Sequence, residues 1–247
     1  MPNQLLKLSE RIYYLPFSQE TDRPNLGYIR GDRYALMIDA GNSANHAQLF
    51  LSQLQELNLP LPDYVAITHW HWDHTFGMHA VAAKSITCNL TNEQLQEVVN
   101  WQWDDHAMAK RLTTGEDIEF CDTHIRKEYP DRSDIKVQTA DIVFDRELQL
   151  DLGGITCRLV KIGSPHSEDS VAIYIPEERI IFLGDASGGD YYHNKGLYDK
   201  TKLLNFIDFI KATDFDTCVE GHDTAITKEQ LLAYMEEELN ILKENLT

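Results

Sequence analysis

Apolar and polar residues follow two patterns of spacing along this chain, one typical of strands and the other of helices. Short apolar runs bounded by glycine, proline or acidic pairs predict strands, whereas apolar residues at three- and four-residue spacing predict helices. The predicted strands cover residues 11–17, 26–30, 34–39, 64–67, 85–90, 141–144, 147–151, 156–162, 171–175, 179–183 and 217–221. The predicted helices cover residues 43–57, 75–84, about 91–111, 200–212 and 227–245.

The stretch 91–139 interrupts this regular succession. Beyond residue 112 it is polar and irregular, and it is too short and too poor in apolar residues to bury a core of its own. We therefore predict a single domain spanning residues 1–247, with a helical and irregular insertion at about 91–139. A length of 247 residues suits one large domain or two small ones. Periodicity alone predicts only a mixture of α and β structure.

The chain is strongly acidic. It has 22 Lys and Arg against 40 Asp and Glu, a formal charge of −18. Such a field repels phosphate backbones, so we expect no nucleic-acid partner. The first residues have no apolar core of signal-peptide length, and no run approaches the ~20 apolar residues of a membrane span. We therefore expect a cytoplasmic protein with no membrane partner.

Four metal-capable side chains lie within six positions of the segment 68–77, Thr-His-Trp-His-Trp-Asp-His-Thr-Phe-Gly. The segment follows an apolar run that predicts a strand, and residues i and i+2 of extended chain point the same way. His69 and His71 can therefore face one metal, while a turn after them can present Asp73 and His74 beside that pair. Imidazole and carboxylate groups are ligands of zinc and similar divalent ions.

Further candidate ligands stand where other apolar runs end. His166 follows the run 156–162, Asp185 closes the run 179–184, and His222 follows the run 217–221. Asp39 closes the run 34–38 and precedes Ala40-Gly41. Loops held by a rigid scaffold are where binding sites are usually built. A single His or Asp of this kind is usually a surface or core residue, so only the whole set indicates a metal site.

In this pattern the chain resembles the metallo-β-lactamase superfamily, residue by residue and in order from Asp39 to His222. The resemblance implies an α+β fold, the αββα sandwich of two mixed sheets flanked by helices, with metals at one edge of the sheets. It implies that Asp39 orients a ligand histidine without binding metal itself. The third motif departs from the family, with Pro165-His166-Ser167-Glu168-Asp169 where many members read Gly-His-Thr-x-Gly. The implied ligands are His69, His71 and His166 for one metal, and Asp73, His74 and His222 for a second, with Asp185 bridging.

The implied cofactors are two divalent ions, Zn²⁺ in the first instance, with iron and manganese also compatible with the ligands. A bridging water whose pKa falls from its usual high value toward about 7 supplies hydroxide at neutral pH. The resulting hypothesis is a binuclear metal-dependent hydrolase of a small-molecule ester, thioester, lactone or phosphodiester. Asp73 and Asp185 are the carboxylates assigned to catalysis. A homo-oligomer is compatible with the sequence.

Other activities stay open. Members of the same fold include iron-dependent oxidoreductases such as persulfide dioxygenases, and a metal-binding protein without turnover is a third interpretation. A true β-lactamase is disfavoured, because zinc β-lactamases typically have Cys or Ser where this chain has Asp185. Lactonases of the family have a tyrosine where this chain has Gly188. The nearby Tyr191, Tyr192 and His193 are candidate substrate-binding residues, although packing within their loop explains them equally well.

Overall fold

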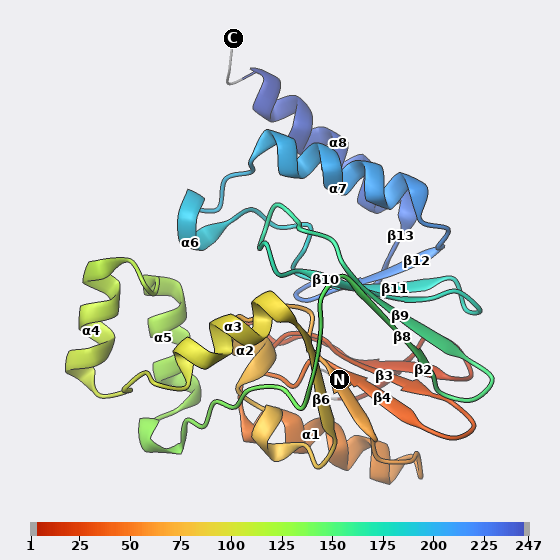
Figure 1. The fold of residues 1–247 in the computed structure, drawn as a ribbon, viewed down its shortest axis with the longest axis horizontal. Coiled ribbons are helices and arrows are strands. Elements are labelled where there is room, and N and C mark those ends of the chain that lie inside the picture. The colour runs from red at the N-terminus through yellow and green to blue at the C-terminus, as the bar shows by residue number, and fades with distance from the viewer. Residues whose placement is uncertain (1–3, 245–247) are drawn as a thin grey trace.

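Two mixed β-sheets pack face to face, with helices on both outer faces (Figure 1). The computed structural model describes residues 4–244. The first sheet has the order β1 (Leu6–Lys7), β2 (Ile12–Leu15), β3 (Leu26–Arg30), β4 (Ala35–Ile38), β5 (Tyr64–Ala66), β6 (Lys84–Cys88) and β7 (Ile142–Phe144). The second has the order β13 (Ile226–Thr227), β12 (Thr217–Glu220), β11 (Ile180–Gly184), β10 (Val171–Ile175), β9 (Thr156–Lys161) and β8 (Glu147–Asp151). The predicted αββα sandwich is confirmed.

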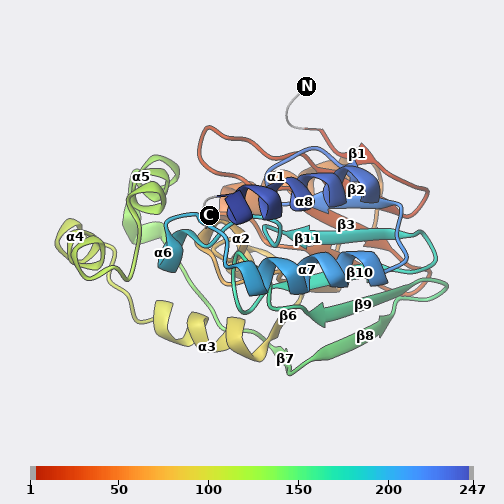
Figure 2. The ribbon, with the colours of Figure 1, turned by 90° about the horizontal axis from the view of Figure 1, so that it is seen from above.

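Helices cover each sheet from outside. The helix α1 (Ala44–Glu56) lies under the first sheet, and its Phe50 and Leu54 join a cluster with Met37 of β4. The helices α7 (Lys200–Ala212) and α8 (Lys228–Glu244) lie side by side over the second sheet (Figure 2). The helix α3 (Asn89–Val98) flanks the edge formed by β6 and β7. Among residues 4–244, no helix combines the length and the apolar character needed to cross a lipid bilayer.

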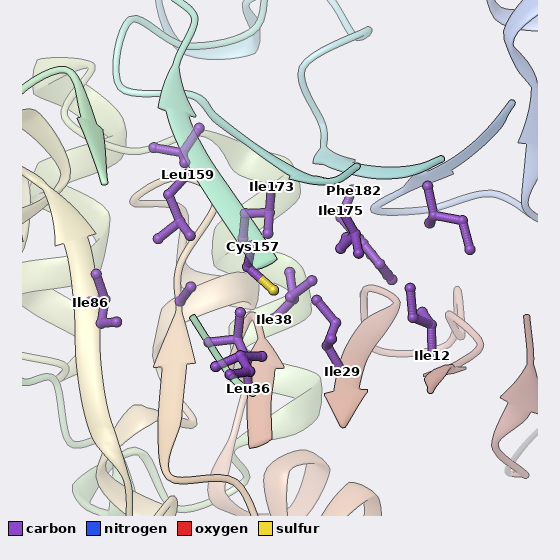
Figure 3. Packing of buried hydrophobic residues seen from close by; sticks show 14 of the residues in the cluster. Ile12, Ile29, Leu36, Ile38, Ile86, Cys157, Leu159, Ile173, Ile175 and Phe182 are labelled. Carbon is purple, nitrogen blue, oxygen red and sulfur yellow. The ribbon is translucent and has the colours of Figure 1, made fainter. Parts of the chain in front are cut away.

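The main core lies between the two sheets. Leu36 and Ile38 of β4 face Ile173 and Phe182 of the second sheet (Figure 3). Met37, which lies between Leu36 and Ile38 on β4, points instead to the cluster under α1, as strand alternation requires. Because both faces of β4 are covered, this strand is apolar throughout, which is typical of the buried strands of layered α/β folds.

The chain after the cluster 68–77 differs from the prediction of a helix over 75–84. A single turn, α2 (Trp72–Thr75), is followed by a 3₁₀ turn at Met78–Ala80 and then directly by β6. The break falls at Gly77. Its N–H donates to the carbonyl of Gly41 at 2.9 Å, and a Cβ at this position would collide with the carbonyl oxygen of Ala40.

The insertion is more ordered than its composition indicates. The single helix predicted over about 91–111 is two helices, because Asp104 accepts hydrogen bonds from the backbone of His106 and Ala107 and so starts α4 (Asp105–Thr114). The prediction of irregular chain after residue 112 is wrong, because α5 (Glu119–Glu128) lies there. Its buried face holds only Cys121, Asp122 and Ile125, too few apolar residues to give a clear helical period.

Candidate metal centre

The candidate ligands meet at one edge of the sandwich, beyond the carboxyl ends of several strands. His69 and His71 follow β5, and α2 carries Asp73 and His74. The loop between β9 and β10 provides His166. Asp185 directly follows β11, and His222 follows β12, which runs parallel to β11. Parallel strands end at the same edge, so residues far apart in sequence are brought together there.

Three buried imidazoles form the first cluster. The Nε2 atom of His69 lies 3.0 Å from Nδ1 of His71, and Nε2 of His166 lies 3.1 Å from the same Nδ1. The three side chains are nearly inaccessible, at 1%, 8% and 6% exposure. Three ring nitrogens therefore face one another at the separations of atoms that could share one cation.

Two carboxylates and two imidazoles form the second cluster. Asp73 Oδ2 lies 3.1 Å from His74 Nε2 and 3.0 Å from His222 Nε2. Asp185 Oδ1 lies 3.5 Å from His74 Nε2, and its Oδ2 lies 3.5 Å from His222 Nε2. That same Oδ2 is 3.8 Å from His166 Nε2 of the first cluster. Asp185 thus stands between the two groups.

Hydrogen bonds behind the clusters fix which nitrogen is free in the rings of His69, His74 and His166. Asp39 Oδ2 accepts from His74 Nδ1 at 2.8 Å and from the Thr68 hydroxyl at 2.9 Å. That hydroxyl can then accept from His69 Nδ1 at 3.1 Å. The carbonyl of Gly189 accepts from His166 Nδ1 at 2.9 Å. Each Nδ1 proton is thereby committed, and the three Nε2 lone pairs point into the clusters.

The donor set fits divalent metal ions. Lone pairs that face one another repel, and a cation between them removes that cost. Within residues 4–244, His74 Nε2 and Asp185 Oδ1 are buried atoms with no hydrogen-bond partner. The end of β12 also comes so close to Asp185 that a Cβ on Gly221 would collide with Oδ1. The arrangement therefore leaves these donor atoms without a hydrogen-bond partner.

The electrostatics keep His69 and His71 neutral and the carboxylates of Asp73 and Asp185 ionised. Burial lowers the pKa of His69 well below its usual range, and the neighbouring His74 and His71 lower it further. Burial acts to raise the pKa of Asp185, but His222 and His74 outweigh it and hold that pKa well below its usual range. Neutral imidazole and ionised carboxylate are the protonation states that bind metals.

A cavity of about 940 Å³ opens beside the two clusters. His71, Asp73, His166, Asp185 and His222 all contribute to its wall. This volume is in the range of pockets that enclose small organic ligands. The cavity therefore provides room for a substrate next to the candidate ligands.

Of the three candidate substrate-binding residues, two line this cavity. Tyr191 is 57% exposed at its mouth. Tyr192 is inside, with its ring 4.9 Å from that of His71 and its hydroxyl 3.4 Å from both Asp117 Oδ1 and Cys121 Sγ. His193 is not part of the wall, because its side chain is 83% exposed and lies beside Asp190.

Some residues of the site have no clear signal in the sequence. Asp22 lines the cavity, and its Oδ1 lies 3.7 Å from His222 Nδ1. Burial and the neighbouring Asp73 raise the pKa of Asp22 to about 7. The helix α5 supplies Phe120, Cys121 and His124 to the wall, so the insertion helps to enclose the site. A lone Asp in a polar loop and a weakly amphipathic helix give no pattern that would single them out.

Known proteins share this fold and this sequence pattern. A family model described as the metallo-beta-lactamase superfamily matches residues 21–222. No curated protein sequence matches the chain.

Solved structures superpose along almost its whole length. A metallo-beta-lactamase from Pontibacter korlensis has 18% identity and a TM-score of 0.66, covering 94% of this chain and 98% of that one. A metallo-beta-lactamase family protein from Thermus thermophilus has 17% identity and a TM-score of 0.68, covering 97% of this chain and 82% of that one. A motif mutant of a metallo-beta-lactamase from Cronobacter sakazakii has 15% identity and a TM-score of 0.69, covering 99% of this chain and 97% of that one. At these identities the likeness is one of fold.

Proposed function

This chain belongs to the metallo-beta-lactamase superfamily, and on that premise we propose that it is a hydrolase that uses two divalent metal ions. The proposed substrates are small molecules with an ester, thioester, lactone or phosphodiester bond. Zn²⁺ is the ion we propose first, because neutral imidazole and carboxylate donors suit it. Iron and manganese accept the same donors.

One observation carries the proposal: ring nitrogens of His69, His71 and His166 converge, and Asp185 connects this cluster with the second. When bound, a pair of such ions lowers the pKa of a water molecule and polarises the bond that is to be cleaved. The protein's part is to hold the donors rigidly. Asp39 and Thr68 anchor two of the imidazoles from behind, so little reorganisation is needed when ligands are engaged.

The two carboxylates assigned to catalysis differ in position. Asp73 contacts both His74 and His222 of the second cluster, whereas Asp185 reaches across to the first cluster. Both line the cavity, and the pKa of each lies below its usual range despite burial, because His74 and His222 stand beside them. Both would therefore remain ionised, offset the positive charge of the ions and accept hydrogen bonds from a substrate or water.

The test is elemental analysis of protein purified without added metal, followed by assay of that sample on thioester, lactone, phosphodiester and β-lactam substrates. We expect turnover of at least one class, loss of turnover on chelation and recovery when one metal is restored. His166→Ala should abolish it, and His193→Ala, which alters an exposed histidine outside the cavity, should not. A metal-replete protein that is inactive on every class would contradict the proposal.

A further inference from the structure

The wall of the cavity carries carboxyl groups beyond the candidate metal ligands. Asp73 and Asp185 belong to the clusters, but Asp22, Glu220 and Asp223 also line the cavity. Among residues 4–244, no Lys or Arg lines it. A carboxylate or phosphate on the substrate, outside the bond to be cleaved, would therefore find no lysine or arginine to pair with.

Two basic side chains that lie next to the cavity in sequence, Arg23 and Lys228, form hydrogen bonds outside it. Arg23 follows Asp22, but its Nη2 donates to Glu128 Oε1 at 2.7 Å. Lys228 follows β13, but its Nζ donates to the carbonyls of Lys211 and Thr213 at 3.2 and 2.5 Å. These groups already have partners, so turning either of them into the cavity would break existing hydrogen bonds.

The mouth of the cavity is aromatic. Phe120, Tyr191 and Tyr234 line it and remain 53%, 57% and 44% exposed, which is unusual for large side chains in one place. They come from α5, α6 (Tyr191–Asn194) and α8, so three separate elements contribute to one rim. The ring of His124 lies 4.2 Å from that of Phe120 on the same wall. Aromatic faces bind apolar groups and also attract cations.

From this wall we infer that the substrate carries no negative charge outside the bond to be cleaved, and that the part filling the cavity is apolar or positively charged. The inference rests on the proposed function, because the metal-binding clusters are taken to receive the reacting end of the molecule. It goes further by assigning the rest of the substrate to the aromatic rim and the acidic wall beside His222. Glutathione-like or nucleotide-like substrates, with several negative charges, are thereby disfavoured.

The size of the repulsion follows from the charges in the wall. Two like charges about 7 Å apart repel by about 1–2 kcal/mol when the effective dielectric constant lies between about 20 and 40, which corresponds to about tenfold in affinity. Glu220 and Asp223 are both in the wall, on either side of His222. An anionic group placed beside them meets this repulsion, while a neutral group does not and a cation is attracted.

Three hydroxamic acids test the inference by binding rather than turnover. They share one metal-binding head and a six-carbon tail that ends in methyl, trimethylammonium or carboxylate. Calorimetry on the zinc-loaded protein should show the carboxylate tail binding about tenfold more weakly than methyl, and the trimethylammonium tail binding at least as well. In the double variant Glu220→Gln/Asp223→Asn the penalty on the carboxylate tail should shrink to about threefold or less. The matched control Asp208→Asn, on the exposed face of α7, should keep the full penalty.

The possible results distinguish a failure of this inference from a failure of the proposed hydrolase function. If the methyl-tailed compound binds and the carboxylate-tailed compound binds equally or better, the inference is overturned while the metal site stands. If the penalty persists unchanged in the double variant, the acidic wall is not its source and the inference is equally overturned. If the methyl-tailed compound does not bind the zinc-loaded protein, both the proposed function and the inference fail.

Discussion

Asp39 accepts a hydrogen bond from Nδ1 of His74 at 2.8 Å, with both side chains almost completely buried. The same carboxylate accepts from the backbone N–H and the hydroxyl of Thr68. Asp39 holds this position with a φ of 56°, a conformation that L-residues other than Asn and Asp rarely adopt. Such local strain is typical of functional sites, where surrounding contacts hold the residue in place.

We therefore expect Asp39→Asn to weaken metal binding without unfolding the protein. An amide keeps the size of the side chain but can present an N–H to His74, which favours the wrong tautomer. The affinity of the second cluster should fall by about 10- to 100-fold, the usual effect of removing such a partner. Competition with a chelator measures it. Asp32→Asn, an exposed residue that pairs with Arg11, is the control and should bind metal as the unaltered protein does.

Removal of Asp22 should weaken metal binding less than removal of Asp39. Its Oδ1 is 3.7 Å from His222 Nδ1, too far for a hydrogen bond, so its influence is chiefly electrostatic. We expect Asp22→Asn to lower metal affinity by about tenfold or less. The same chelator titration, carried out beside Asp39→Asn, checks the order. A larger loss of metal affinity in Asp22→Asn than in Asp39→Asn would contradict this order.

Gly221→Ala should impair metal binding through a steric effect. The added methyl would collide with Asp185 Oδ1 and displace the carboxylate that stands between the two clusters. We expect lost metal content together with about 1–3 kcal/mol of lost stability. Gly115→Ala is the matched control, because nothing lies within 4 Å of its added Cβ and only its φ of 76° is unfavourable. It should lose about 1 kcal/mol in urea unfolding and keep its metal. Full metal content in Gly221→Ala would disprove the steric argument.

Asp117 should make stability depend on pH. Burial raises the pKa of this carboxyl from 3.8 to about 6. Since its folded-state pKa lies above its unfolded-state pKa, its favourable contribution is complete below about pH 3.8 and is lost as pH rises through about 6. Asp117→Asn can keep the hydrogen bond from the Ile118 N–H and removes the charge. The variant should therefore be more stable than the unaltered protein by up to about 3 kcal/mol at pH 8, and equally stable near pH 4. Urea unfolding at both pH values is the measurement; a difference independent of pH would contradict it.

The strands and the ligand segments were predictable because each rests on a local pattern. The strands β4 and β10 are apolar runs with clear ends, and the residues that follow strands gather at one edge once the sheets form. The segment 68–74 shows the limit of this reasoning. His69 and His71 face one cluster although β5 ends at Ala66, so extended chain beyond the strand, rather than the strand itself, presents them.

The insertion and the supporting residues depend on tertiary contacts that no local pattern contains. Arg111 is 5% exposed and packs between Trp101 and Trp103, with its guanidinium carbon 4.5 and 4.7 Å from the two ring centroids. A charged residue in a polar stretch would not be assigned to a buried stack from sequence. Thr68 and the carbonyl of Gly189 likewise support imidazoles only because the fold brings them there.

Anomalous diffraction from crystals of protein loaded with Zn²⁺ would show whether these side chains form a binuclear metal site. We expect two anomalous peaks in the cavity wall, one about 2.0–2.2 Å from the Nε2 atoms of His69 and His166 and from Nδ1 of His71, and the other at the same distance from His74, His222 and Asp73. Asp185 should lie between them. Zinc-loaded crystals with no anomalous peak among these seven side chains would contradict the proposed site.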